Sequence, residues 1–209
     1  MADADGLDAA VVDRLSEATA GAVSTDLADR EAVAHDLWPY ALIRDRGGRP
    51  LPPPDAVVWP ASAAEVSAVY RLCAASSIPV TPFGAGTGVC GAAVPVRGGV
   101  VLDLKRMDRI VDWDLEAGWV TVEPGILGQR LEDAAQARGW SLGHFPSSLP
   151  CSTVGGFVAT RSAGQLSTRY GRIDDRLAGL RAVLSDGGHV HLRAQPATGA
   201  GPDLRRLFL

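Results

Sequence analysis

The apolar positions in the first quarter of the chain predict one short helix followed by a linker. The helix spans residues 8–20, and four apolar side chains share one of its faces at helical spacing: Val11, Val12, Leu15 and Ala18. Residues 21–55 are mixed in character and end in the run Gly-Gly-Arg-Pro-Leu-Pro-Pro-Pro at 47–54, a composition typical of a linker. We therefore assign residues 1–54 to an N-terminal helix and a lead-in segment.

A strand–helix–strand pattern follows this segment. The apolar run at residues 56–59 predicts a strand. Ser62 and Glu65 form a capping box, in which the serine oxygen accepts the amide of the third helical residue and the glutamate returns to the serine amide. Residues 78–81 predict the second strand. These elements make a compact βαβ lobe, for which we predict the bounds 55–104.

A glycine-rich loop follows the second strand. It holds four glycines in eight residues: Gly84, Gly86, Gly88 and Gly91. Because glycine has no Cβ atom, such a loop exposes consecutive backbone N–H groups, which form a concave site for a phosphate or pyrophosphate. The loop is therefore a candidate nucleotide-binding segment, and the alternative is a glycine-rich turn that binds no ligand.

The residues after this loop distinguish it from two common nucleotide loops. A P-loop continues with Lys and Ser or Thr, whereas Ala92 and Ala93 follow the last glycine here. The spacing of the last three glycines matches the dinucleotide fingerprint, but that fingerprint must open a helix, and Pro95 does not allow one. The next regular element is a strand at 100–104. We therefore expect backbone amides alone to hold the phosphates.

A second lobe is predicted after Leu104. Residues 119–123 read as a strand, Pro124-Gly125 turns the chain, and residues 127–138 predict a helix that ends before Gly139.

The last predicted pair of strands spans residues 177–184 and 189–193. Asp186-Gly187 between them is a strong hairpin signal. We assign lobe two to residues 105–209 and predict an α+β fold, in which a small βαβ lobe precedes a lobe with a mixed or antiparallel sheet and helices. Residues 55–209 then form one two-lobed domain that we expect to be truncated at its C-terminus.

Small residues and hydroxyl groups are concentrated between residues 144 and 171. They include Ser147, Ser148, Ser152, Thr153, Gly155, Gly156, Thr160, Ser162 and Gly164. This composition lets a flat ligand lie close to the main chain while hydroxyls and amides bind its polar edge. The alternative is a long surface loop, but a loop of this length within a compact domain is uncommon without a role.

Composition and charge narrow the class of protein. The net charge is −4 and no basic run occurs, which argues against a nucleic-acid partner. The N-terminus is acidic and has no apolar segment of a secretory signal, and no apolar run approaches the roughly 18 residues needed to span a membrane. Three cysteines, Cys73, Cys90 and Cys151, without paired spacing favour reduced thiols and a cytoplasmic protein. No His/Cys cluster has metal-ligand spacing, so we expect no metal site.

The order of these motifs resembles a known cofactor-binding domain. In chain order, the motifs are a strand–helix–strand unit, Pro82-Phe-Gly-Ala-Gly-Thr-Gly88, Val122-Glu-Pro-Gly, Ser152-Thr-Val-Gly-Gly156 and Tyr170-Gly171. This set resembles the FAD-binding domain of the vanillyl-alcohol oxidase and p-cresol methylhydroxylase superfamily. Within it, residues 143–148, 152–156 and 159–165 are similar to alkyldihydroxyacetonephosphate synthase and its bacterial relatives. The D-lactate dehydrogenase and glycolate oxidase subunits are the next nearest.

The resemblance implies FAD as the cofactor and assigns residues to it. The first loop would hold the pyrophosphate through backbone amides, and the second cluster would line the flavin and the ribityl chain. The implied cofactor-binding residues are Pro82, Phe83, Gly84, Ala85, Gly86, Thr87, Gly88, Ser147, Ser148, Leu149, Pro150, Cys151, Ser152, Thr153, Gly155, Gly156, Thr160, Arg161, Ser162 and Ala163. Superfamily members with a covalent flavin often carry a histidine in the first loop; Thr87 and Gly88 stand there, which favours non-covalent FAD.

The resemblance also implies what this sequence lacks. Full members continue with another glycine-rich flavin segment and a substrate domain, so we expect their acid–base and substrate groups to lie beyond Leu209. We therefore predict the FAD-binding part of an FAD-linked oxidase or dehydrogenase that acts on a C–H next to oxygen, or of a synthase like the ether-lipid enzyme. The alternative is a non-catalytic FAD-binding fragment or subunit. The expected partners are a small-molecule substrate and a homo-oligomer or partner domain that completes the site.

Individual polar residues have a functional and a structural interpretation. His144 is a candidate proton shuttle, although local packing is the more common role of a loop histidine. His189 and His191 alternate on one strand face and favour a solvated face over a metal site. Cys90 has no partnered base and is interpreted as a small packing residue. Arg161 and Arg169 are surface charges or contacts to an anion.

Overall fold

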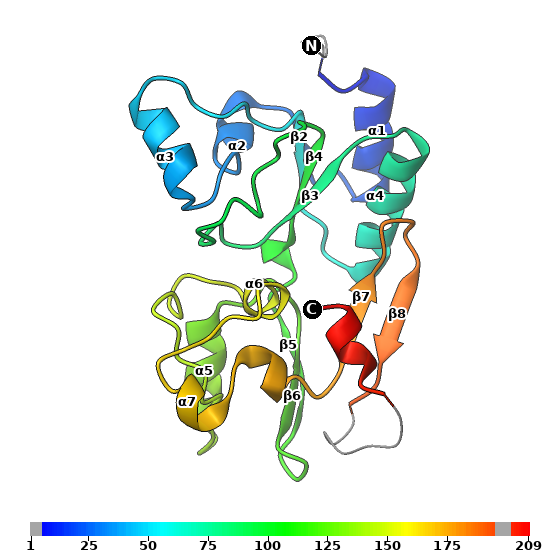
Figure 1. Ribbon diagram of the computed structural model, residues 1–209. Helices are drawn as coiled ribbons and strands as arrows, with labels where there is room; N and C mark the ends of the chain where they lie inside the picture. The colour runs from blue at the N-terminus through cyan, green and yellow to red at the C-terminus, as the bar shows by residue number, and fades with distance from the viewer. Residues whose placement is uncertain (1–5, 195–201) are drawn as a thin grey trace. The chain divides into compact units, whose positions relative to one another are not determined.

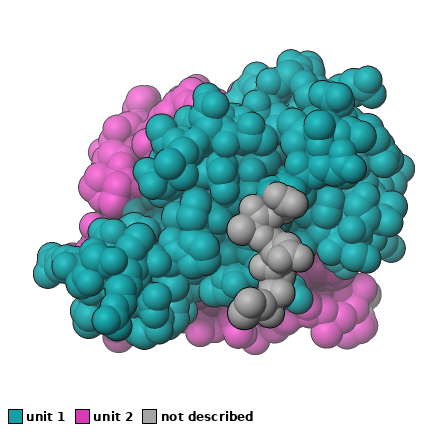
Figure 2. Space-filling view, turned by 90° about the horizontal axis from the view of Figure 1, so that it is seen from above, with its two compact units in different colours: residues 1–106, 183–188 teal, residues 107–182, 189–209 magenta. Residues whose placement is uncertain are grey.

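The computed structural model describes residues 6–194 and 202–209. The chain divides into two compact units, which Figure 2 shows in different colours. Unit 1 comprises the described residues of 1–106 together with Val183–Gly188, and unit 2 comprises those of 107–182 and 189–209. The division into a lead-in segment and two lobes at the predicted bounds stays a prediction.

Unit 1 is built on a four-stranded sheet (Figure 1), whose strand order is β1-β2-β4-β3. Its strands are β1 (Val23–Ser24), β2 (Ala56–Val58), β3 (Val80–Phe83) and β4 (Val100–Asp103). β2 and β3 run parallel to β4, with Val57 and Thr81 both in register with Val101, while β1 is antiparallel to β2. Every residue of β2 and β4 is buried, because helices or loops cover both faces of central parallel strands. These strands therefore form the core of unit 1.

Helices flank this sheet on two sides in Figure 1. Helix α1 (Ala9–Ala18) packs beside α4 (Ala63–Ala75), and the shorter α2 (Leu27–Glu31) and α3 (Pro39–Arg46) lie on the other side. The predicted helices at residues 8–20 and after Ser62 are confirmed. The Ser62 hydroxyl accepts the Glu65 amide at 3.2 Å, as predicted, but the Glu65 carboxylate accepts the Ala61 amide at 2.9 Å rather than that of Ser62. The capping box thus closes one residue earlier than expected.

The predicted lead-in segment holds regular structure. Residues 21–46 contain β1, α2 and α3, and Val33 belongs to the buried cluster around Phe83. Helix α3 begins at Pro39, which suits the first helical position because proline has no N–H to leave unpaired there. The expectation of a linker was wrong for this stretch because two helices of five and eight residues are too short to show a clear apolar period.

Unit 2 contains an antiparallel pair, β5 (Ile110–Asp114) and β6 (Trp119–Val122), with an irregularity in register between Ile110 and Asp112. Strand β6 was predicted and β5 was not. Helix α5 (Gly128–Gln136) is followed by Gly139 at φ +77°, which agrees with the predicted C-terminal glycine.

The second glycine cluster is not a long loop, because it contains α6 (Val154–Ala159) and α7 (Ser167–Tyr170). A 3₁₀ turn at Ile173–Arg176 follows it. The predicted hairpin is present as β7 (Leu180–Val183) and β8 (His189–Leu192), with Gly187 at φ +81°, and a 3₁₀ turn at Leu204–Leu207 ends the described chain. The mixed, mainly parallel sheet of unit 1 and the antiparallel β5–β6 pair of unit 2 confirm the α+β prediction. No helix in the described ranges is long and apolar enough to cross a bilayer.

Gly99 is the residue whose missing side chain matters most to unit 1. A Cβ atom at Gly99 would lie 2.2 Å from the Pro79 carbonyl oxygen, and its φ is +75°. Gly21, also in unit 1, has φ +81° but nothing within 4 Å of its Cβ position. We expect Gly21→Ala to lower the free energy of unfolding by about 1 kcal/mol, the cost of the left-handed backbone.

Gly99→Ala adds a backbone clash to the same φ strain, so we expect it to cost at least about 2 kcal/mol more than the Gly21 variant. Urea denaturation of both variants measures this difference. Equal losses would show that β3 and β4 can separate at no cost.

Candidate cofactor-binding site

The first candidate segment, Pro82–Gly88, begins with the last two residues of β3 in unit 1 and continues into the loop after this strand. Phe83 is buried, and Gly84, Ala85 and Gly86 are half-buried. The amides of Gly84, Ala85, Gly86 and Gly88 donate no hydrogen bond within unit 1 as the structure describes it. Unpaired amides at a partly exposed turn are the donor set that binds an anion.

The glycines of this loop are required by the residues beneath it. A Cβ atom at Gly86, where φ is +66°, would lie 2.8 Å from the Phe83 ring. A Cβ atom at Gly88 would lie 3.0 Å from the carboxylate of Asp36, and one at Gly91 would lie 2.8 Å from the indole of Trp38. We call Asp36, Trp38 and Phe83 the shelf. At these three glycines the loop lies on the shelf with no side chain in between, and its unpaired amides fit the pyrophosphate of FAD.

The second candidate segment is held by backbone hydrogen bonds within unit 2. The amides of Gly128 and Gln129 donate to the carbonyls of Ser152 and Leu149 at 2.9 and 3.0 Å. The amide of Gly155 donates to the Pro124 carbonyl at 2.8 Å. The predicted turn after β6 therefore lies directly against the predicted second cluster. The motifs quoted from positions 122–125 and 152–156 are neighbours in space.

Glycine allows this close approach at three positions. A Cβ atom at Gly155 would lie 2.6 Å from Pro124, and one at Gly128 would lie 2.6 Å from the Phe157 ring. A Cβ atom at Gly164 would lie 2.7 Å from the backbone of Phe145. These glycines thus have a packing role in unit 2, whatever they contact in a ligand.

Helix α6 organises the small and hydroxylated residues. The Thr153 hydroxyl accepts the Gly156 amide at 3.3 Å as an N-cap, and Thr160 donates back to the Gly156 carbonyl at 2.9 Å. After α6, Arg161 adopts φ +48°, a left-handed backbone conformation that is uncommon for residues other than glycine and is often found at functional sites.

The predicted second-cluster residues differ in exposure. Those that are exposed are Ser147, Pro150, Cys151, Thr160, Arg161 and Ala163. Leu149, Ser152 and Thr153 are buried. The structure thus places the second set around α6 in unit 2 and the first set, Pro82–Gly88, in unit 1. The exposed members present their side chains to solvent, whereas Leu149 packs against Gly128.

His144 is buried beneath this segment. Its Nε2 lies 2.7 Å from the Ser162 hydroxyl, and its ring packs edge-on against Phe157. Its Nδ1 is buried and has no hydrogen-bond partner among the described residues. Burial lowers the pKa of His144, and the nearby charge of Arg176 lowers it further. These contacts favour the packing interpretation of His144 over a proton shuttle.

Glu132 fixes the chain that leads into His144. Its carboxylate is buried and accepts the Leu142 amide at 2.9 Å, the Ser141 hydroxyl at 2.8 Å and the Gln136 amide group at 2.8 Å. Sequence reasoning missed Glu132, because a glutamate in mid-helix is normally a solvated residue. Three accepted hydrogen bonds satisfy its carboxylate and hold the segment after α5 in place.

The other singled-out residues lie at the surface. Cys90 is exposed, so its interpretation as a packing residue was wrong; the loop is too open there to bury it. The Arg169 guanidinium lies 5.0 Å from the Tyr170 ring centroid, a local cation–π contact. His189 and His191 are exposed on β8, as expected of a solvated strand face.

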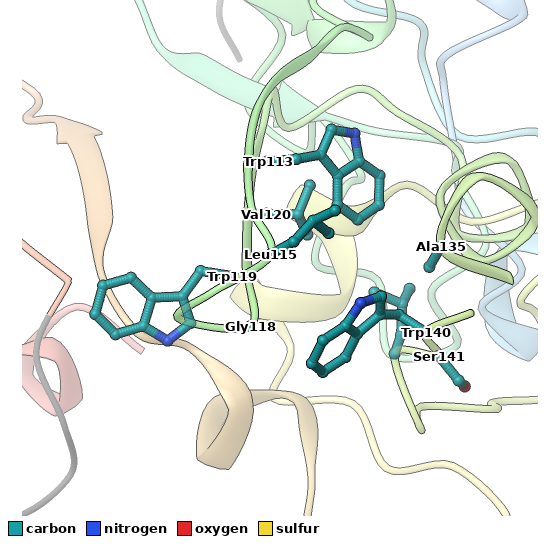
Figure 3. A pocket seen from close by; sticks show the side chains of 9 residues that line it. Trp113, Leu115, Gly118, Trp119, Val120, Ala135, Trp140 and Ser141 are labelled. Atoms are coloured by element: carbon teal, nitrogen blue, oxygen red, sulfur yellow. The ribbon is translucent and has the colours of Figure 1, made fainter. Parts of the chain in front are cut away.

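Figure 3 shows a small pocket elsewhere in unit 2. Trp113, Leu115 and Val120 of the β5–β6 hairpin face Trp140 and Ala135 across it, while Trp119 points away. Its volume is about 50 Å³, and none of the predicted cofactor-binding residues lines it. Pockets that enclose drug-sized ligands measure roughly 300–1,000 Å³, so this cleft cannot enclose FAD.

Comparison with known proteins identifies the family. Residues 54–193 match the model of the FAD binding domain family, which is more than half of the chain. This protein belongs to the FAD binding domain family. The prediction of FAD as the cofactor is thereby confirmed.

Relatives agree with the predicted resemblance. The uncharacterized FAD-linked oxidoreductase YgcU of Escherichia coli is 40% identical over 160 residues, which cover 76% of this chain and 33% of that protein. The glycolate oxidase subunit GlcD of Bacillus subtilis is 36% identical over 157 residues, covering 75% and 33%. A solved structure of alkyldihydroxyacetonephosphate synthase superposes with a TM-score of 0.89 at 30% identity, covering 100% of this chain and 38% of that one. The chain spans about a third of the length of the curated relatives it matches.

The buried imidazole of His144 makes the stability of unit 2 depend on pH. In the folded protein, burial and the charge of Arg176 lower the pKa of His144 and so disfavour its protonated form. The unfolded chain protonates this residue near its ordinary pKa of about 6.5 and so binds more protons below that pH. We expect the free energy of unfolding to fall as the pH drops from about 7 to 5, and His144→Gln to flatten this dependence.

His189→Gln is the matched control, because His189 is exposed on β8 and has no buried contacts to lose. Urea denaturation across the pH range gives the slopes. If the free energy of unfolding of the His144 variant depends on pH as steeply as that of the wild type, His144 is not the source of the pH dependence.

Proposed function

We propose that this chain is the FAD-binding part of an FAD-linked oxidoreductase that takes a hydride equivalent from a C–H next to oxygen. The observation that carries the proposal is the loop on the shelf, whose unpaired amides suit a pyrophosphate. It occurs in a chain that belongs to the FAD binding domain family. Bound FAD supplies the hydride-accepting chemistry, while the protein binds and orients it.

Each part of the two candidate segments has a proposed role. The amides between Pro82 and Gly88 hold the pyrophosphate, and the hydroxyls and amides between Ser147 and Thr153 line the cofactor. Gly155 and Gly156 allow close approach of the chain to the flavin, and residues 160–163 contact the flavin or ribityl region. The exposure of Thr160 and Arg161 supports the last assignment, because their polar side chains are open to a ligand.

The proposed cofactor link is non-covalent. The loop from Pro82 to Gly91 contains no histidine, so it offers no imidazole for a flavin bond. We also place the protein in the cytoplasm, because Cys73, Cys90 and Cys151 are all free thiols. A partner domain or a second copy of the chain completes the site in this proposal.

Two substrate classes follow from the relatives. The glycolate oxidase subunit favours a small 2-hydroxy acid, whose C–H next to oxygen gives up the hydride. Alkyldihydroxyacetonephosphate synthase is the second candidate, favoured because its structure superposes over the whole of this chain. An electron-acceptor dye assay with glycolate and other 2-hydroxy acids, beside an assay with acyl-dihydroxyacetone phosphate and a fatty alcohol, separates the two classes.

We expect FAD to leave the protein on denaturation. Purified protein is loaded with FAD, freed of excess cofactor and precipitated with acid. The flavin absorbance should appear in the supernatant, because only non-covalent contacts hold the cofactor. Flavin that stays with the pellet would contradict the non-covalent assignment, and a protein that retains no FAD before precipitation would contradict the proposed function.

A further inference from the structure

Asp36 is a buried carboxylate beneath the glycine loop. It is 1% exposed, and each of its two carboxylate oxygens accepts a hydrogen bond from a backbone amide. One oxygen accepts the Trp38 amide at 3.0 Å, and the other accepts the Gly91 amide at 3.1 Å. Asp36 therefore connects the start of α3 to the far end of the loop, 55 residues later.

The same oxygen that binds the Gly91 amide also limits the space at Gly88. A Cβ atom at Gly88 would lie 3.0 Å from it, and a Cβ atom at Gly91 would meet Trp38. The loop is thus pressed onto Asp36 and Trp38 at two points. Between β3 and Gly91, the amides of Gly84, Ala85, Gly86 and Gly88 have no partner within unit 1. The contact that fixes the end of the loop leaves its middle amides available.

We propose that Asp36 is a positioning residue for the cofactor: it holds the loop so that the unpaired amides converge on the FAD pyrophosphate. The inference rests on the proposed function, because it needs that loop to bind FAD. Asp36 itself lies below the loop and does not present its charge to solvent. Its role is to shape the amide site, and its carboxylate is the acceptor that two amides require.

Charge and geometry make opposite predictions for the variant Asp36→Asn. Removal of a negative charge near a pyrophosphate should tighten FAD binding if charge alone mattered. An asparagine, however, has one acceptor oxygen and one donor NH₂ group, so it cannot accept both the Trp38 and the Gly91 amides. A positioning role therefore predicts weaker FAD binding despite the lost repulsion.

Asp55 provides a matched control in the same unit. Its carboxylate accepts the Gly99 amide at 2.7 Å, and a Cβ atom at Gly98 would lie 3.1 Å from that carboxylate. Asp55→Asn thus makes the same charge change at the same kind of aspartate–glycine contact. Asp55 precedes β2 and lies outside the candidate segments.

The experiment measures FAD dissociation constants by flavin fluorescence quenching and melting temperatures without FAD. It compares the wild-type protein, Asp36→Asn and Asp55→Asn. We expect Asp36→Asn to weaken FAD binding roughly five- to tenfold, the effect of one lost charge-assisted hydrogen bond. We expect Asp55→Asn to stay within about twofold of the wild type, because its bond supports the strands and not the loop. Hydrogen exchange of peptides covering residues 84–91 should speed up only in the Asp36 variant.

Each outcome decides a different point. Unchanged or tighter FAD binding by Asp36→Asn overturns the positioning role, and so does an equal loss in both variants. A wild-type protein that binds no FAD overturns the proposed function instead. Should Asp36→Asn not fold, Asp36→Ser, whose hydroxyl retains one acceptor, is measured in its place against Asp55→Ser, and the same comparison of FAD affinities holds.

Discussion

The lack of space for a Cβ atom at glycine positions is the constraint on which both candidate segments depend. Buried main-chain N–H and C=O groups must be paired, and a segment that packs closely against its neighbours has no room for side chains. Gly128 and Gly155 satisfy both demands in unit 2, since each donates its amide across the contact and neither could carry a Cβ atom there. At the loop after β3, the side chains of the shelf leave no room for a Cβ atom at Gly86 or Gly91, and the amides of Gly84, Ala85, Gly86 and Gly88 have no partner within unit 1. Packing and ligand binding therefore require the same residue type.

The sequence indicated elements whose signal is local and strong. The apolar runs of β2 and β4, the Ser62 cap and the Asp186-Gly187 hairpin each depend on a few adjacent residues, and each is found in the structure. The stretch from 21 to 46 and helix α6 were missed for a physical reason. They hold helices of only five, eight and six residues, and tertiary contacts rather than apolar period stabilise such short helices.

The candidate site was predictable to the extent that glycine marks it. The positions of the loop glycines could be read directly, but the shelf beneath them could not, because Asp36 and Trp38 lie about 50 residues earlier and carry no motif. Glu132 was missed for another reason: its partners Ser141 and Leu142 are only nine and ten residues away, but a glutamate in mid-helix is normally solvated and carries no signal of burial. A high glycine content shows where main-chain donors are exposed, whereas no sequence pattern shows which side chains orient them.

Aspartate–glycine contacts recur in this chain as a way to end a turn. Asp36 accepts the Gly91 amide, Asp55 accepts that of Gly99, and Asp186 accepts that of Gly188 at 2.7 Å. A short carboxylate reaches a nearby amide without a long flexible stem, so little side-chain entropy is lost when it is fixed. The contacts differ in sequence separation. Asp186 and Gly188 are two residues apart within one hairpin turn, whereas Asp36 and Gly91 are 55 residues apart. The first kind stabilises a turn locally, and the second kind makes the shape of a binding loop depend on a segment far away in sequence.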